Sequence, residues 1–138
     1  MRLRLVALRF GLLVLVPCSY HLEVCAAQQR PALIVGTYSD IHYIEEAGDV
    51  IGTEIRITFS DRAYHGTLEI AQGVPGIPIP ISIKVDGKKI SFSFSNDGPY
   101  IGTFEGELDR GRLSGKLSFK NGYTEKVSLP KKSEHSQK

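Results

Sequence analysis

The fold class is decided by residues 84–129, which read KVDGKKISFSFSNDGPYIGTFEGELDRGRLSGKLSFKNGYTEKVSL. Apolar and polar side chains alternate in this stretch, and the alternating runs are separated by turn sequences. These turns are Asp86-Gly87, Asn96-Asp97-Gly98-Pro99, Asp109-Arg110-Gly111 and Asn121-Gly122. A period of two punctuated by Asx-Gly turns is the strongest short-range indication of antiparallel hairpins. The stretch therefore predicts four strands, at 88–95, 99–108, 112–120 and 123–129.

Four more strands are expected before this stretch, at 33–46, 50–59, 64–70 and 81–85. The last two are separated by Gly73–Pro80, which holds three prolines within six residues. Proline cannot donate to a β-ladder, so this segment is expected to be a long loop rather than a central strand. Residues 131–138 are polar and are expected to form a flexible tail.

Eight short antiparallel strands joined by tight turns favour an all-β fold, a single eight-stranded up-and-down barrel, because closing the meander removes two exposed edges. A two-sheet β-sandwich is the alternative, but it needs long crossover connections that this chain mostly lacks. A membrane barrel would turn one face of every strand toward lipid. The polar face here carries Arg56, Lys84, Glu105 and Lys116, so we expect the apolar face to point inward and no membrane span.

Residues 1–27 have the pattern of a secretory signal peptide, and residues 28–130 are expected to form the barrel domain. Three arginines precede the apolar run Phe10–Val16, and Ala26-Ala27 offers a cleavage site. The run is too short to cross a bilayer. Both cysteines, Cys18 and Cys25, would leave with the leader, and the residues before them do not favour lipidation. We therefore expect a disulfide-free protein that is secreted or periplasmic.

The charge balance of the expected mature chain is neutral. The whole chain has 17 Lys or Arg and 15 Asp or Glu, of which the leader holds three and one, leaving 14 of each sign. A neutral chain without a basic stripe lacks the electrostatic footprint of nucleic-acid binding. Nucleic acid is therefore excluded as an expected partner.

Gly36-Thr37-Tyr38, near the start of the first predicted strand, is similar to the lipocalin Gly-x-Trp motif with Tyr in place of Trp. The strand layout resembles the calycin group of small closed β-barrels, to which the lipocalins belong. The chain departs from that pattern in having no Trp, no C-terminal helical segment and no disulfide. Further motifs resemble small exported bacterial barrel domains, which often accompany hydrolases as accessory modules. They are Gly66-Thr67-Leu68, Ile77-Pro78-Ile79, Val85-Asp86-Gly87 and Leu113-Ser114-Gly115. The resemblance implies a fold rather than a function.

The sequence gives little indication of catalysis or metal binding. Gly111–Gly115 lacks the Gly-x-Ser-x-Gly spacing of a hydrolase nucleophile. Asp40 and His42, with Glu45 and Glu46 nearby, supply at most half of a metal site. The favoured interpretation is a solvated polar stretch, because the sequence has no second His-rich segment to provide the remaining ligands. We expect no enzyme, no catalytic residue, no metal and no cofactor. An enzyme would require these residues to cluster with Asp61 and His65.

The expected binding site is the barrel end that carries the proline-rich loop. In a meander, alternate connections fall at alternate ends, so 46–49, 72–80, 96–99 and 121–122 share one end. Exposed apolar loops can mark binding sites. The candidate ligand-binding residues are Val74, Pro75, Ile77, Tyr100, Tyr123 and the motif residue Tyr38.

The barrel interior is expected to be largely filled, with at most a shallow pocket at the mouth. An eight-stranded barrel is just wide enough for its side chains or for one small ligand. Four glycines fall at inward-facing positions of the alternating pattern, and we expect the missing side chains to leave room for large neighbours to interdigitate. They are Gly66, Gly102, Gly106 and Gly115. The bulky inward set is Phe59, Leu68, Ile70, Ile83, Val85, Phe92, Phe94, Phe104, Leu108, Leu117, Phe119 and Val127.

The favoured functional hypothesis is a monomeric, non-enzymatic module that binds a small apolar or amphipathic molecule at the mouth. The alternative is a protein–protein interaction module of the cell envelope, such as an accessory factor or a protease-inhibitor-like protein, with the 72–80 loop as the contact.

Overall fold

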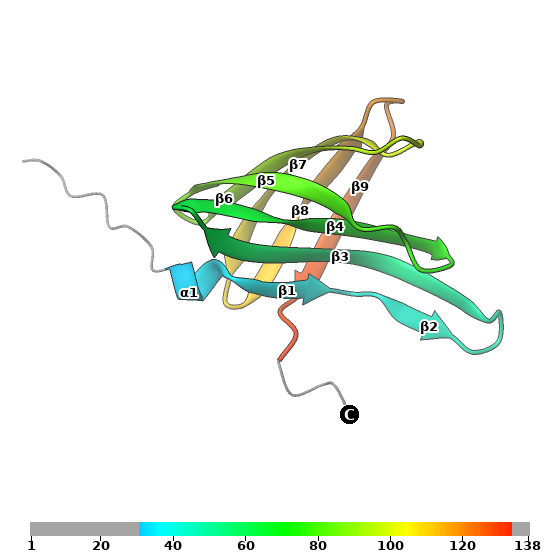
Figure 1. Cartoon of the computed structure of the whole chain (residues 1–138). Coiled ribbons are helices and arrows are strands. Elements are labelled where there is room, and N and C mark those ends of the chain that lie inside the picture. The colour runs from blue at the N-terminus through cyan, green and yellow to red at the C-terminus, as the bar shows by residue number, and fades with distance from the viewer. Residues whose placement is uncertain (1–30, 134–138) are drawn as a thin grey trace, which may run out of the picture.

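The structure is a computed structural model that describes residues 31–133, so the expected signal peptide lies outside the described residues (Figure 1). A single helical turn, α1 (Pro31–Ile34), precedes nine strands. The strands are β1 (Gly36–Ser39), β2 (His42–Ile44), β3 (Asp49–Ser60), β4 (Ala63–Gly73), β5 (Ile79–Asp86), β6 (Lys89–Ser95), β7 (Ile101–Asp109), β8 (Arg112–Phe119) and β9 (Thr124–Pro130). Between residues 31 and 133 no helix is long and apolar enough to cross a membrane.

All nine strands belong to one antiparallel sheet in which β1 and β2 both pair with β3, and each later strand pairs with the next. The path β1-β3-β4-β5-β6-β7-β8-β9 is an eight-stranded up-and-down meander that curls until its two ends almost meet (Figure 1). The predicted all-β, eight-stranded barrel is therefore confirmed, in preference to a two-sheet sandwich.

The seam of the barrel is closed at one end only. Tyr38 forms an isolated bridge with Lys131, and the Lys132 amide donates to the Thr37 carbonyl oxygen, 2.7 Å away. The Lys131 amide also donates to the carbonyl oxygen of Gly111 at 2.8 Å. The first two residues of the expected polar tail therefore hold the first strand beside the last. Toward the other end of the barrel, β2 has β3 as its pairing partner, and β9 pairs with β8.

The single strand predicted at 33–46 is wrong, because this segment forms α1, β1 and β2. The break between β1 and β2 lies at Asp40, whose side-chain Oδ1 accepts a hydrogen bond from the Thr53 amide at 2.7 Å. The Asp40 amide in turn donates to the Thr53 carbonyl oxygen at 3.1 Å. Gly52, opposite the break, has a φ of 121°, and a Cβ there would lie 2.8 Å from the Asp40 carbonyl oxygen. Glycine thus allows the edge strand to bend against β3.

The middle of the barrel is filled by aromatic and branched side chains. Phe104 is fully buried and stacks on Phe92 with ring centroids 4.9 Å apart. A Cβ added at either Gly106 or Gly115 would lie 2.6 Å from Phe104 Cζ. These two glycines therefore make room for the ring, as expected from their inward parity. The core cluster also includes Tyr38, Ile55, Ile57, Leu68, Ile90, Leu113, Leu117 and Leu129.

One member of the predicted inward set lies on the inward side of its strand but outside the packed core. Phe59 is 41% exposed and packs against Tyr64, with ring centroids 4.8 Å apart. Both residues lie near the β3–β4 turn, where Tyr64 still packs against the edge of the core and Phe59 extends beyond it. Alternation assigns the correct side of the strand but not the point at which the strand leaves the core.

Candidate functional site

Four connections lie at the same end of the barrel, as the meander predicts. They join β2 to β3 (45–48), β4 to β5 (74–78), β6 to β7 (96–100) and β8 to β9 (120–123). In Figure 1, the β3–β4 side and the β7–β9 side diverge toward this end. We call this end the mouth.

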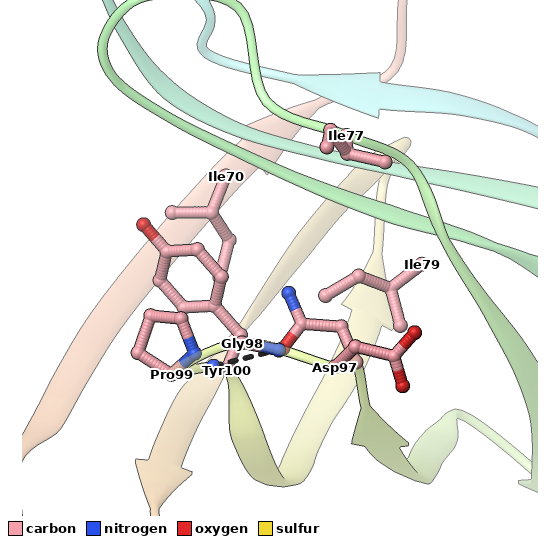
Figure 2. Close-up of a pocket in the computed structure, with 8 residues that line it drawn as sticks. Ile70, Ile77, Ile79, Asp97, Gly98, Pro99 and Tyr100 are labelled. Carbon is pink, nitrogen blue, oxygen red and sulfur yellow. Dashed lines mark hydrogen bonds between the residues drawn. The ribbon is translucent and has the colours of Figure 1, made fainter.

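A pocket of about 410 Å³ lies at the mouth, between the β4–β5 loop and the β6–β7 turn (Figure 2). Its walls are mostly apolar, and they come from segments that are far apart in the sequence. The lining residues are Ile70, Ile77, Ile79, Asn96, Asp97, Gly98, Pro99 and Tyr100. An apolar concavity with a few polar groups is the usual form of a small-molecule site.

The turn side of the pocket is held by Asn96. Its side-chain Oδ1 accepts hydrogen bonds from the amides of Gly98, at 3.1 Å, and Tyr100, at 3.0 Å. The Asn96 amide donates to the Tyr100 carbonyl oxygen at 3.1 Å. An Asx turn of this kind fixes the backbone locally, which explains why Asn rather than an apolar residue begins the turn.

The two walls are connected across the mouth. The Tyr100 hydroxyl donates to Gln72 Oε1 at 3.1 Å, which links the start of β7 to the end of β4. A Cβ at Gly76 would overlap the Ile70 carbonyl group, so the β4–β5 loop lies directly against β4. The loop and the turn are therefore both anchored to the barrel wall.

The candidate binding residues occupy four different positions. Ile77 and Tyr100 line the pocket, whereas Val74 and Pro75 lie in the same loop without lining it. Val74 is 69% exposed and Ile77 is 84% exposed. Tyr123 is 58% exposed and packs on Phe119, with ring centroids 5.6 Å apart. Phe119 lies 6.3 Å from the Tyr100 ring, so these three aromatic residues form a row along the mouth from β7 to β9.

Tyr38, the remaining candidate, is inside the core rather than at the pocket. Its ring is fully buried, and its hydroxyl donates to the Ile34 carbonyl oxygen at 2.7 Å. Lys131 Nζ lies 5.8 Å from the ring centroid, and burial raises the pKa of the phenol. The residue that resembles the lipocalin motif thus packs next to the closed part of the seam.

Several pocket residues were missed by sequence reasoning. The sequence predicts Ile70 in the core and Ile79 in a motif typical of small barrels, but it predicts neither at the mouth. Asn96 and Asp97 were recognised as turn residues only. Their role as walls depends on how two connections meet in space, which period-two alternation does not specify.

One acidic side chain enters the barrel near the mouth. Glu125 alternates with the buried residues Val127 and Leu129 on the inward face of β9, and it is half-buried. Burial, and secondly the negative charge of Asp40, raise the pKa of the Glu125 carboxyl group.

The residues considered for metal binding or catalysis do not form one cluster. Asp40 is engaged with the Thr53 amide, and His42 Nδ1 lies 2.8 Å from the Asp40 carbonyl oxygen. Asp61 occupies the β3–β4 turn, at the end opposite the mouth. Within residues 31–133, no group of three His, Cys, Asp or Glu side chains is arranged to hold a metal ion.

A second depression, of about 540 Å³, lies over β5, β6 and β7. Charged side chains occupy much of its wall, including Lys84, Lys89, Glu105 and Glu107. Val85 and Ile90 also contribute to its lining, but the lining is more polar in proportion than that of the mouth pocket, so this depression is the weaker candidate for an apolar ligand.

Comparison with protein-family models, with curated proteins and with solved structures finds no match to this chain.

Proposed function

We propose that this chain is an exported, non-enzymatic binding protein that holds a small apolar or amphipathic molecule at the mouth of its barrel. The observation that carries the proposal is the mouth pocket, whose apolar residues Ile70, Ile77 and Ile79 face an anchored turn. The filled middle of the barrel supports a site at the mouth rather than in a deep central cavity. The proposed calycin-like relationship is consistent with this use of a small barrel.

Native mass spectrometry of the protein purified from its own host tests the proposal. The native mass should exceed the denatured mass by that of one small molecule, and the excess should fall when Ile77 and Ile79 are replaced by Ser. Unchanged ligand retention in this double variant would place the ligand elsewhere. A bare monomer that also fails to bind added alkanols would overturn the proposal.

A second candidate function is supported by one separate observation. Val74 and Ile77 project from the β4–β5 loop with most of their surface in solvent, and exposed apolar side chains on a loop are typical of protein contacts. In this proposal the chain is an accessory or protease-inhibitor-like module of the cell envelope. Recovery of a defined partner with wild-type protein, and its loss with Val74→Ser, would support this function; equal recovery with the variant would contradict it.

A further inference from the structure

The end of the barrel opposite the mouth carries an excess of basic residues that the proposed function does not use. Its connections are the hairpin turns β3–β4 (61–62), β5–β6 (87–88) and β7–β8 (110–111), together with residues 131–132 after β9. These segments hold one acidic residue, Asp61, against five basic ones. The basic residues are Arg62, Lys88, Arg110, Lys131 and Lys132. We call this end of the barrel the basic end.

The excess of positive charge is confined to the basic end. Two strand-end pairs beside its turns hold one charge of each sign and do not offset it; they are Asp86–Lys89 and Asp109–Arg112. The connections at the mouth have the opposite balance, with Glu45, Glu46 and Asp97 against Lys120. In Figure 1 the three hairpin turns and α1 lie on the left and the mouth connections on the right. A chain with a formal net charge of only +2 therefore has two ends of opposite sign, and such a field orients a protein against a charged surface.

Each of the three hairpin turns presents one basic side chain to solvent. The side chain of Arg110 is 94% exposed and that of Lys88 is 63% exposed. Arg62 has no acidic partner among residues 31–133. Lys88 Nζ lies 2.7 Å from Asp109 Oδ1, but this pair is at the surface, where solvent screens it. These charges are therefore available to an external anion.

Two of these turns place an arginine in a backbone conformation that usually favours Gly or Asn. The φ angle is 62° at Arg62 and 48° at Arg110, both in the left-handed region. Asn-Gly and Asp-Gly are the usual sequences of tight hairpins, and this chain uses Asn121-Gly122 at the mouth. The turn geometry does not require arginine at either position. The positive charge at the two hairpin tips is the property that arginine adds there.

Apolar side chains lie at the same end as these charges. Phe59 is 41% exposed next to the β3–β4 turn, and Leu33 of α1 is 64% exposed. Leu33 belongs to this end because Gly36, the first residue of β1, pairs with Ile57 near the end of β3. Basic groups together with exposed apolar side chains are typical of surfaces that bind at the lipid–water interface. A soluble polyanion would be held by the charges alone.

We propose that the basic end docks on an anionic phospholipid surface. The basic side chains of the three hairpin turns contact the lipid phosphates, while Leu33 and Phe59 enter the headgroup boundary. A fluid lipid surface adapts to three separate hairpin tips, so the docking needs no preformed cavity. The acidic mouth then faces away from the membrane. This inference goes beyond the proposed function and does not depend on the mouth pocket.

Cosedimentation with vesicles tests the docking. One set of vesicles contains phosphatidylcholine alone, and the other also contains about 30% phosphatidylglycerol. At low salt we expect the anionic vesicles to bind the protein at least about tenfold more tightly, and about 0.5 M salt should abolish the difference.

The decisive variant is Arg62→Asn combined with Arg110→Asn, because Asn removes the charge and suits a left-handed backbone. It should weaken binding to anionic vesicles at least about tenfold, since each basic residue near such a surface contributes about fivefold. The matched control is Lys120→Asn, which removes a positive charge in the β8–β9 connection at the mouth and should leave binding within about twofold of wild type.

Leu33→Ser separates a lipid surface from a soluble polyanion. It should weaken binding to anionic vesicles several-fold without changing retention on a heparin column. Vesicle binding that this variant leaves unchanged would contradict the lipid contact. Retention on heparin by a protein that binds neither vesicle would overturn lipid docking in favour of a soluble polyanion.

The remaining outcomes locate the charge and keep this inference separate from the mouth site. Equal weakening by Lys120→Asn and by the double arginine variant would show that total charge, rather than the basic end, controls binding, and would overturn the proposal. Circular dichroism of each variant establishes that lost binding does not arise from unfolding. Octan-1-ol binding tests the mouth independently, so a failure of docking leaves the proposed function standing.

Discussion

The Tyr38 hydroxyl donates its hydrogen bond to the carbonyl oxygen of Ile34, 2.7 Å away and four residues earlier in the chain. This contact links the helical turn before the sheet to the most buried part of the seam. It satisfies a hydroxyl group that would otherwise be desolvated without a partner.

Replacing Tyr38 by Phe should lower stability, because the buried Ile34 carbonyl loses its hydrogen-bond donor. The expected loss in the free energy of unfolding is about 1–3 kcal/mol. Urea denaturation followed by circular dichroism measures it. Tyr43→Phe is the matched control, since Tyr43 is 60% exposed on edge strand β2. Equal stability of the two variants would show that the buried hydrogen bond contributes nothing.

Replacing Gly115 by Ala should destabilise the barrel, because the new Cβ would lie 2.6 Å from Phe104 Cζ and 2.5 Å from the Glu105 carbonyl oxygen. Overpacking of this kind typically costs about 1–3 kcal/mol. Gly98→Ala is the control, since the nearest atoms to its added Cβ are 3.6 Å away. Adding Phe104→Leu to Gly115→Ala should recover only part of the loss, because the backbone contact remains. A Gly115→Ala protein as stable as the Gly98→Ala control would refute the close packing of Phe104.

Truncation after Pro130 should destabilise the chain relative to truncation after Ser133. The shorter chain loses the Lys131 bridge to Tyr38 and the hydrogen bond from the Lys132 amide to Thr37. Each backbone hydrogen bond contributes about 0.5–1.5 kcal/mol, so the difference should be roughly 1–3 kcal/mol. Thermal denaturation of the two chains measures it. Identical melting temperatures would mean that the seam does not depend on these residues.

Replacing Glu125 by Gln should raise stability at pH 7 and flatten its pH dependence. Burial first, and Asp40 second, raise the folded-state pKa of this carboxyl group. The folded protein therefore holds this proton more tightly than the unfolded chain, and the wild type loses stability as the pH rises from the ordinary value of 4.5 through the folded value. Below that ordinary value both proteins carry a neutral side chain there, and their melting temperatures should converge. A variant that is less stable at pH 7 would contradict this assignment.

Replacing Ile77 by Ser should weaken octan-1-ol binding about fivefold, which corresponds to roughly 1 kcal/mol of lost apolar contact. Stability should change by less than about 0.5 kcal/mol, because the side chain is exposed. Val74→Ser is the matched control, in the same loop but outside the pocket lining. Equal weakening by both variants would favour a general effect of the loop over the pocket.

The strands of this protein were largely predictable because local chemistry specifies them. Asp86-Gly87, Asp109-Arg110-Gly111 and Asn121-Gly122 are turns in the structure, and Gly87, Gly111 and Gly122 all have positive φ angles. Alternation then assigned Phe92, Phe94 and Phe104 correctly to the interior. These features depend only on residues close together in the chain, so the sequence specifies them without tertiary information.

The parts that failed or were missed depend on contacts between distant segments. The break at Asp40 requires Thr53 and Gly52 on another strand, and the inward set gave no indication that Phe59 lies beyond the packed interior. Glu125 reads as one more polar residue in a short strand until β9 is placed next to β3. Topology alone predicted that four connections share one end of the barrel, but the pocket walls at that end form only when the sheet curls.

Because the Tyr38–Lys131 bridge brings the first and last strands together, the fold does not require the chain to start at β1. Its first and last strands are neighbours at one end of the barrel, so residues 31 and 133 can be joined by a short linker without crossing the mouth. A circularly permuted gene could open the chain at the exposed turn between Gly87 and Lys88. Its product would keep every strand next to the same neighbours in the sheet. The order of translation is then separable from the architecture, and the two walls of the mouth pocket, residues 70–79 and 96–100, would be made from opposite ends of the permuted chain.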